Sequence, residues 1–204
     1  MNKNEFEKTL IEVRKAYRLI YLYQRRVLDL IDFIGNKLSL NFESGWSKFS
    51  NPAGTRKRVN LKKWSWDWLM LYFYEFHFGV VKNEIRFSII LQSDSGFFDS
   101  KSNDKLDIST FKNAEESKTK LFFVLGNKIW GCPIENFLKD HLNSNQTEFK
   151  KEINDNGLWL AKSYELTNFI NEESTINIIN DFLRYSEKNG ITILEGKNEA
   201  QQYI

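Results

Sequence analysis

Cysteine, histidine and proline are scarce in this sequence. A single cysteine, Cys132, excludes an internal disulfide and a zinc site built from several thiolates. The two histidines, His77 and His141, could form a metal site only if carboxylates completed it. With two prolines in 204 residues, a long proline-rich linker between domains is also excluded.

The common nucleotide-binding and hydrolase motifs are absent as well. The sequence contains no G-x-x-x-x-G-K-[ST], no G-x-G-x-x-G and no G-x-S-x-G. Hydride transfer, P-loop phosphoryl transfer and α/β-hydrolase chemistry therefore lack their usual sequence support. We expect no bound metal and no cofactor.

Long apolar runs are missing too. The longest, Leu69 to Phe78, is interrupted by Glu75 and His77 and is too short to span a bilayer. The start of the chain, Met1 to Lys8, is polar and of mixed charge, unlike a signal peptide. We expect no membrane partner and a cytoplasmic location.

Aromatic residues, by contrast, are abundant. The chain has 17 Phe, 8 Tyr and 6 Trp, and 41% of its residues are hydrophobic, which is typical of a folded globule. Its length suits one sizeable domain with a true core and is short for two. We therefore expect a single domain over residues 1–204.

The clearest pattern lies in the first forty residues, where apolar side chains recur at alternating spacings of four and three. Gln24 is the one polar member of this stripe, whose apolar members are Phe6, Leu10, Val13, Tyr17, Ile20, Val27, Ile31, Ile34 and Leu38. The spacing predicts one long amphipathic helix within residues 1–38. The stop signal Gly35-Asn36 places its end near Ile34.

The second half of this helix is more apolar than the first. A second apolar row joins the stripe there, formed by Leu19, Tyr23, Leu30 and Phe33. We expect that half, from Leu19 to Phe33, to dock on the protein's own sheet. The first half keeps four stripe residues for a protein partner or for self-association, namely Phe6, Leu10, Val13 and Tyr17.

The rest of the chain reads as strands and two shorter helices, in the region 64–194. Aromatic alternation predicts a strand from Trp66 to Phe78 that turns back at Gly79 to Asn83. Further strands are expected at 85–91, in a hairpin of 121–125 with 128–130 around Gly126-Asn127, at 158–164 and at 191–194. A short helix is expected after Pro133, and a longer one capped by Asn171 or Ser174 and closed by Asn189-Gly190.

This order predicts an α+β fold. Because hairpin turns replace regular crossover helices, the sheet should be mainly antiparallel, with about five strands. The long N-terminal helix and the C-terminal helix should pack on it. Residues 39–63 are expected to form an irregular connector, and no strand is expected in the hydrophilic stretch 143–156.

Positive charge is concentrated in the N-terminal part, since residues 1–80 carry 14 Lys/Arg against 8 Asp/Glu. The densest segment is basic and then aromatic, with Arg56, Lys57, Arg58, Lys62, Lys63 and Trp64. Such a mixture can attract phosphates and stack on unpaired bases, which predicts contact with nucleic acid or another anion. The alternative is structural: basic residues solvate a connector, and the next tryptophans, Trp66 and Trp68, enter a core strand.

One enzymatic alternative is a small metal-dependent nuclease. Glu75 and His77 share one face of the predicted strand, and Glu84 begins the next one, so they could hold a metal and activate water. The structural alternative is that Glu75 and His77 are partly solvated or satisfy each other in the core. We favour a non-catalytic binding or accessory protein of an intracellular bacterial or phage assembly.

Overall fold

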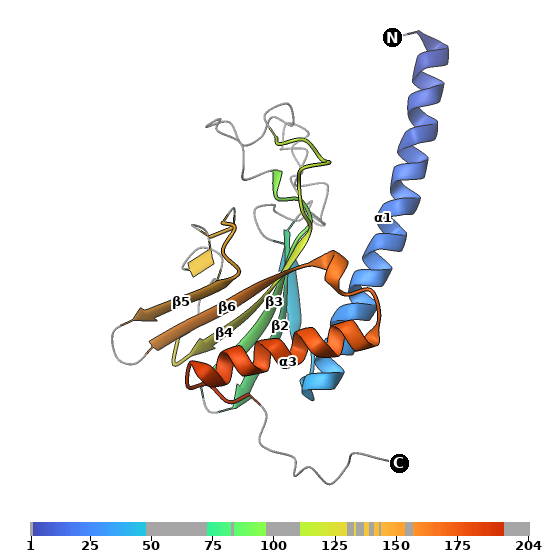
Figure 1. Ribbon diagram of the computed structural model, residues 1–204. Helices are drawn as coiled ribbons and strands as arrows, with labels where there is room; N and C mark the ends of the chain where they lie inside the picture. The colour runs from blue at the N-terminus through green and yellow to red at the C-terminus, as the bar shows by residue number, and fades with distance from the viewer. Residues whose placement is uncertain are drawn as a thin grey trace, which may run out of the picture.

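The computed structural model describes residues 2–47, 73–82, 84–96, 111–129, 133, 137–138, 141–142, 144–153 and 157–193. Within these residues a six-stranded antiparallel sheet is accompanied by two helices, and the longer one projects well beyond the sheet (Figure 1). The predicted α+β class is confirmed. None of the described helices combines the length and the apolar character needed to cross a bilayer.

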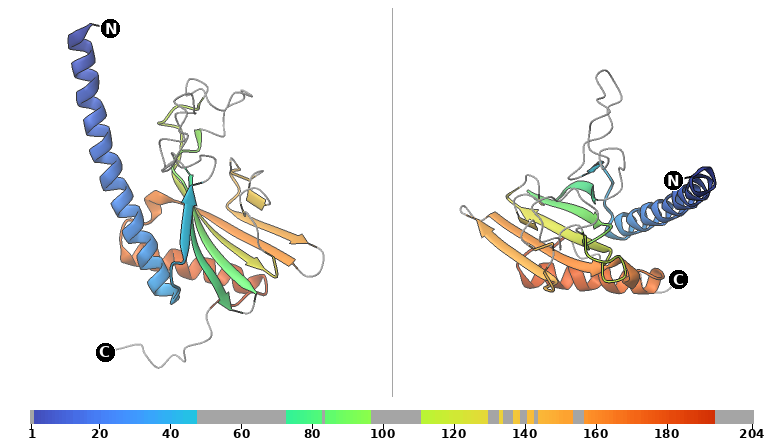
Figure 2. Two further views of the ribbon diagram at one scale, coloured as in Figure 1. Left: turned by 180° about the vertical axis from the view of Figure 1, so that it is seen from behind. Right: turned by 90° about the horizontal axis from the view of Figure 1, so that it is seen from above.

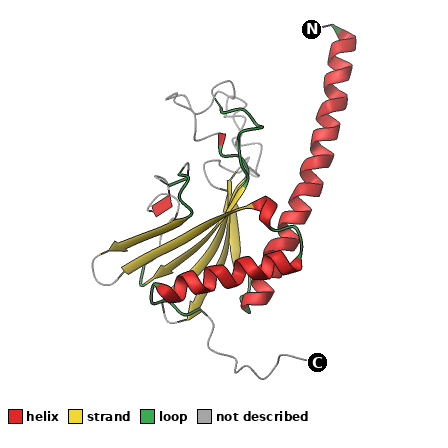
Figure 3. Cartoon of the chain, viewed as in Figure 1, coloured by secondary structure: helices red, strands yellow, loops and turns green. Residues whose placement is uncertain are grey.

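The elements follow one another as a long helix, six strands and a final helix (Figure 3). Their bounds are α1 Lys3–Leu38, β1 Ser44–Ser47, β2 Phe73–Lys82, β3 Ile85–Gln92, β4 Lys120–Asn127, β5 Glu148–Ile153, β6 Gly157–Glu165, the 3-10 helix Leu166–Asn168 and α3 Glu172–Lys188. Across the sheet the strands are ordered β1-β2-β3-β4-β6-β5, and every neighbouring pair is antiparallel.

Both faces of the sheet are apolar at its centre. On β3, Phe87 and Ile89 belong to one core and Ile90 to the other, because successive side chains point to opposite faces. The larger core includes residues of both α1 and α3, so the two helices cover the same face (Figure 2). The smaller core on the second face includes Phe137 and Leu138.

Helix α3 forms where its capping signals predict. The Asn171 side chain accepts a hydrogen bond from the Ser174 amide, and the Ser174 hydroxyl lies within hydrogen-bond distance of the Asn171 amide. The helix ends before Gly190, whose φ of 82° suits glycine. Its apolar side chains, including Phe182, pack against Phe87 and Phe123 of the sheet.

The C-terminal half of α1 docks on the same face. Val27, Ile31 and Ile34 are buried in the larger core, together with Leu38. The helix continues one turn beyond the predicted stop, because Ser39 rather than Gly35 takes the left-handed cap conformation, with φ 55°. Gly35 is needed instead for close packing, since a Cβ there would lie 2.8 Å from the Phe78 ring.

Two strands form in stretches where we expected none. β1 and β5 are the edge strands of the sheet, and β5 is exposed except at Phe149. Edge strands are often short and polar, so their sequences lack the apolar alternation by which strands are recognised. The sheet has six strands rather than about five, because these two are gained while the described residues 128–129 and 191–193 form no strand.

Three local predictions are wrong. Gly126-Asn127 does not form a hairpin turn but lies within β4, opposite Trp159 and Leu158 of β6. Gly79 lies inside β2 at a register irregularity with φ 69°, and the β2–β3 turn comes later, at Glu84. The described residues 191–193 form no strand. Residues 66–72 of the predicted aromatic strand lie outside the described ranges.

Candidate functional site

The most distinctive surface is the N-terminal half of α1. We call residues 3–22 the arm, and every one of them is exposed. Figure 1 shows the arm projecting away from the sheet and from α3. It carries nine large apolar side chains, namely Phe6, Leu10, Ile11, Val13, Tyr17, Leu19, Ile20, Tyr21 and Leu22. An apolar surface of this size that the protein leaves uncovered is typical of an interaction site.

Local interactions contribute to the helix of the arm. At its start, the Asn2 side chain accepts a hydrogen bond of 2.9 Å from the Glu5 amide, and the Glu5 carboxylate accepts one of 2.7 Å from the Asn2 amide. This capping box satisfies two amides that the helix itself cannot. Further along, Lys15 and Glu12 form an exposed ion pair of 2.8 Å. No tertiary contact is needed for these interactions.

Contacts with the body of the protein begin at Tyr23. Its hydroxyl lies 3.2 Å from the Ser93 hydroxyl, and burial raises the pKa of Tyr23 although this hydrogen bond acts to lower it. Arg26 donates a hydrogen bond of 3.1 Å to the carbonyl oxygen of Phe169, ahead of α3. Since Val27 is fully buried, the helix changes from exposed to docked within about one turn.

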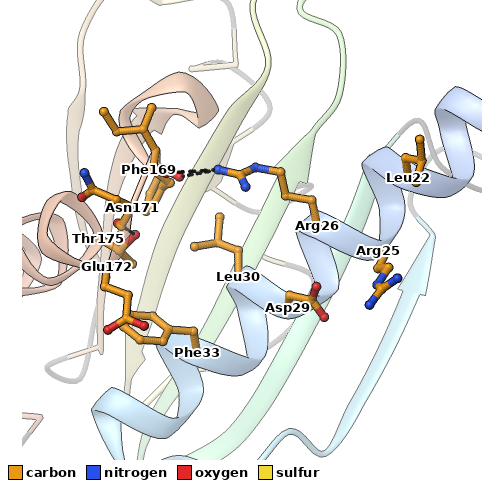
Figure 4. A pocket seen from close by; sticks show the side chains of 11 residues that line it. Leu22, Arg25, Arg26, Asp29, Leu30, Phe33, Phe169, Asn171, Glu172 and Thr175 are labelled. Carbon is orange, nitrogen blue, oxygen red and sulfur yellow. Dashed lines mark hydrogen bonds between the residues drawn. The ribbon is translucent and has the colours of Figure 1, made fainter.

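An open depression of about 310 Å³ lies beside the base of the arm, between α1 and the beginning of α3 (Figure 4). Its rim includes Leu22 and Ile170, which are 59% and 70% exposed. Arg26 crosses it toward Phe169, as the dashed line in Figure 4 shows. The depression therefore adjoins the last turn of the arm.

All four residues predicted to bind a partner lie on the arm. Tyr17 is 66% exposed, and Phe6, Leu10 and Val13 are between 37% and 48% exposed. The prediction that docking begins at Leu19 is wrong, because the Leu19 side chain is 69% exposed. Sequence reasoning thus missed the last turn of the arm. The only available signal was Gln24, the polar residue at the point where the stripe passes from exposed to buried.

Glu75 and His77 lie on the second face of the sheet, and both are buried. Ser88, which the sequence did not single out, joins them: its hydroxyl donates a 3.0 Å hydrogen bond to Glu75 and lies 3.1 Å from Nδ1 of His77. On the other side of the ring, Nε2 of His77 is 3.6 Å from the exposed Glu43 carboxylate. The three side chains meet because β2 and β3 pair His77 with Ser88.

Burial lowers the pKa of His77, although the carboxylates of Glu43 and Glu75 act to raise it. Glu84 is not part of this group, since it lies in the β2–β3 turn, four residues and therefore about 13 Å along the strand from Ser88. Within the described part of the chain, no three His, Cys, Asp or Glu side chains are placed to hold a metal ion. The structure therefore does not bring the three proposed nuclease residues together.

The basic-aromatic segment lies outside the described residues. This applies to each of its proposed anion-binding side chains, Arg56, Lys57, Arg58, Lys62, Lys63 and Trp64. Its contact with nucleic acid stays a prediction.

Comparison with known proteins adds a family and one relative. A family model described as PM0109 matches residues 3–194. A relative from Pasteurella multocida (strain Pm70), named "Uncharacterized protein PM0109", is 54% identical over 39 residues. That stretch covers 19% of this chain and 19% of the relative's length. No solved structure matches the chain.

Proposed function

The chain belongs to the PM0109 family, and we propose that it is a non-catalytic binding module of an intracellular assembly, whose arm binds a protein partner. The observation that carries this proposal is the division of α1 into an exposed apolar half and a buried half. A helix built only to cover the sheet would need residues 23–38. The additional turns, about five and a half in number, serve a surface outside the body of the protein.

The energetic reason lies in the side chains of the arm. Burying a Leu, Ile, Val or Phe side chain completely contributes roughly 1.5–3 kcal/mol. Leu10, Val13 and Ile20 are still between 37% and 42% exposed, so a partner helix with an apolar stripe could gain part of that free energy. The partner would lie along the stripe, as amphipathic helices do in grooves and coiled coils.

Site-specific photo-cross-linking in the native cell tests this proposal. A benzophenone amino acid is placed at Val13 on the stripe or, as the control, at Lys15. The two positions are about 200° apart around the helix, so they face nearly opposite directions. We expect a cross-linked protein product from position 13 and little or none from position 15, with the product identified by mass spectrometry. Equal products from both positions, or none from position 13, would contradict the proposal.

We also propose, as the second part of this function, that the basic-aromatic segment binds an anionic partner such as single-stranded nucleic acid. Support comes from the excess of positive charge in residues 1–80. Reversing the charge of Arg56, Lys57 and Arg58 to Glu should abolish binding of a fluorescent oligonucleotide, and Trp64→Ala should weaken it. Reversal of Lys128, Lys150 and Lys188, which changes the net charge equally, is the control. Binding that is insensitive to salt and to the first reversal would refute this part.

A further inference from the structure

We infer, on the basis of the proposed function, that the partner of the arm is a second copy of this chain. The two arms would pack antiparallel, with Phe6 of each opposite Tyr17 of the other and Leu10 opposite Val13. Four observations lead to this arrangement: the spacing of the stripe, the sheet that already covers its second half, the length of the arm and the placement of its charges.

The spacing of the stripe is that of a coiled-coil seam. Alternating steps of four and three assign Leu10 and Tyr17 to one kind of core position, and Phe6, Val13 and Ile20 to the other. Two helices with such seams pack side by side, each side chain filling a space between residues of the facing helix. The arm therefore has the pattern that another copy of itself would match.

A parallel pair is excluded by the body of the protein. α1 is one continuous helix to Leu38, and from Val27 onward the same stripe is buried against the chain's own sheet. In a parallel pair, the partner helix would run beside residues 27–38 of α1, with the two helix axes about 8–10 Å apart. The sheet already occupies that space. In an antiparallel pair the two bodies lie at opposite ends, and only the arms overlap.

The length of the arm selects one antiparallel register. With Leu10 opposite Val13, four apolar layers form and Asn2 of the partner falls opposite Tyr21, just before the body begins at Tyr23. Sliding the partner outward by one heptad, or seven residues, leaves only two apolar layers. In each of them Phe6 of one chain lies opposite Leu10 of the other. Sliding it inward by one heptad would place Lys3 against Val27, which is already fully buried.

The charges agree with the same register. Glu7 and Arg14 occupy equivalent positions flanking the seam, one heptad apart, and the register brings Glu7 of each chain beside Arg14 of the other. Thr9 and Ala16, which flank the opposite side of the seam, are uncharged and also meet. Like charges would therefore not meet at these positions. In an antiparallel coiled coil, the flanking positions that Glu7 and Arg14 occupy lie beside the same positions of the facing helix. Two symmetry-related ion pairs would therefore support the dimer.

Four layers make a small interface, so association should be reversible and depend on concentration. Sedimentation of the full chain over a concentration series should show a mass that rises from 24.2 kDa toward about twice that value. Glu7→Lys and Arg14→Glu should each raise the Kd roughly tenfold, because each replaces attraction by repulsion in both pairs. Combining the two changes should restore most of the affinity.

Disulfide trapping reports the register directly. In a Cys132→Ser background, Leu10→Cys and Val13→Cys are made separately and are then oxidised alone or after mixing. We expect efficient cross-linking only in the mixture, because position 10 of one chain faces position 13 of the other. Cross-linking of each variant by itself, as parallel or shifted arms would give, overturns the inference.

The remaining outcomes separate this inference from the proposed function. If the chain stays monomeric at the highest concentration while a benzophenone at Val13 captures a different protein, the self-association is wrong and the binding role of the arm stands. If neither self-association nor a Val13 cross-link is found, both are wrong.

Discussion

At the scale of single residues, one polar group on the helix-covered face links three elements. The Lys162 ammonium of β6 donates to Glu148 of β5 at 2.7 Å and contacts Asp181 of α3 at 2.8 Å. The Tyr164 hydroxyl donates a further hydrogen bond of 2.8 Å to Asp181. Burial acts to raise the pKa of Asp181. The hydrogen bonds from Lys162 and Tyr164, together with the positive charges of Lys162 and Arg184, outweigh it, so the pKa lies below its ordinary value of 3.8.

Replacing Asp181 with Asn should therefore lower the free energy of unfolding by about 1 kcal/mol at neutral pH. A carboxylate whose pKa is depressed by folding stabilises the fold above its unfolded pKa, and this contribution is lost as the pH falls through the folded pKa. The difference between wild type and variant should thus shrink below about pH 3.8. Urea unfolding at a series of pH values measures this. A difference that does not change with pH would show that the charge of Asp181 is unimportant.

At the scale of elements, α1 consists of two halves with different roles. Ile31 is 3% exposed and packs in the larger core, whereas Leu10 and Val13 belong to neither of the buried clusters that the described residues form. The two halves share one apolar stripe and one continuous backbone. Their stripes differ in burial because the sheet lies beside the second half only.

Substitutions in the two halves should therefore have opposite consequences. Ile31→Ala should reduce the free energy of unfolding by about 2–4 kcal/mol, since it leaves a cavity in the core. Leu10→Asp combined with Val13→Asp should change the unfolding of the body by less than about 0.5 kcal/mol while abolishing binding by the arm. Denaturant unfolding followed by tryptophan fluorescence compares them. Unfolding of the body by the double Asp variant would mean that the arm belongs to the core.

Sequence patterns were sufficient for elements whose signals are local. The four-three stripe predicted α1, the cap at Asn171 predicted α3, and alternation of apolar residues predicted β3. β1 and β5 were missed because their pairing with β2 and β6, rather than their own side chains, makes them strands. Gly126-Asn127 looked like a turn, yet pairing with two neighbouring strands keeps it extended.

The candidate site was predictable to a similar degree. Phe6 to Tyr17 could be identified because the stripe lacks a second apolar row there. The end of the arm at Leu22 could not, because it depends on where Ser93 and Phe169, far away in the chain, meet α1. Ser88 was missed for the same reason, since only strand register places it between Glu75 and His77.

At the scale of the whole molecule, the arm extends the body by about 30 Å, given 20 residues at 1.5 Å each. Figure 2 shows it reaching beyond the sheet in both views. A helix of this length without tertiary contacts is only marginally stable in water. Its lasting helical structure should therefore depend on a partner, whereas residues 27–38 are stabilised by the sheet.

Hydrogen exchange of backbone amides tests this division most directly. In dilute solution, where the chain is monomeric, amides of residues 6–20 should exchange much faster than those of residues 27–38. Protection of the arm should then rise as the concentration, or the amount of bound partner, increases. Equal and concentration-independent protection of both segments would contradict the central claim that the arm is a binding element outside the core.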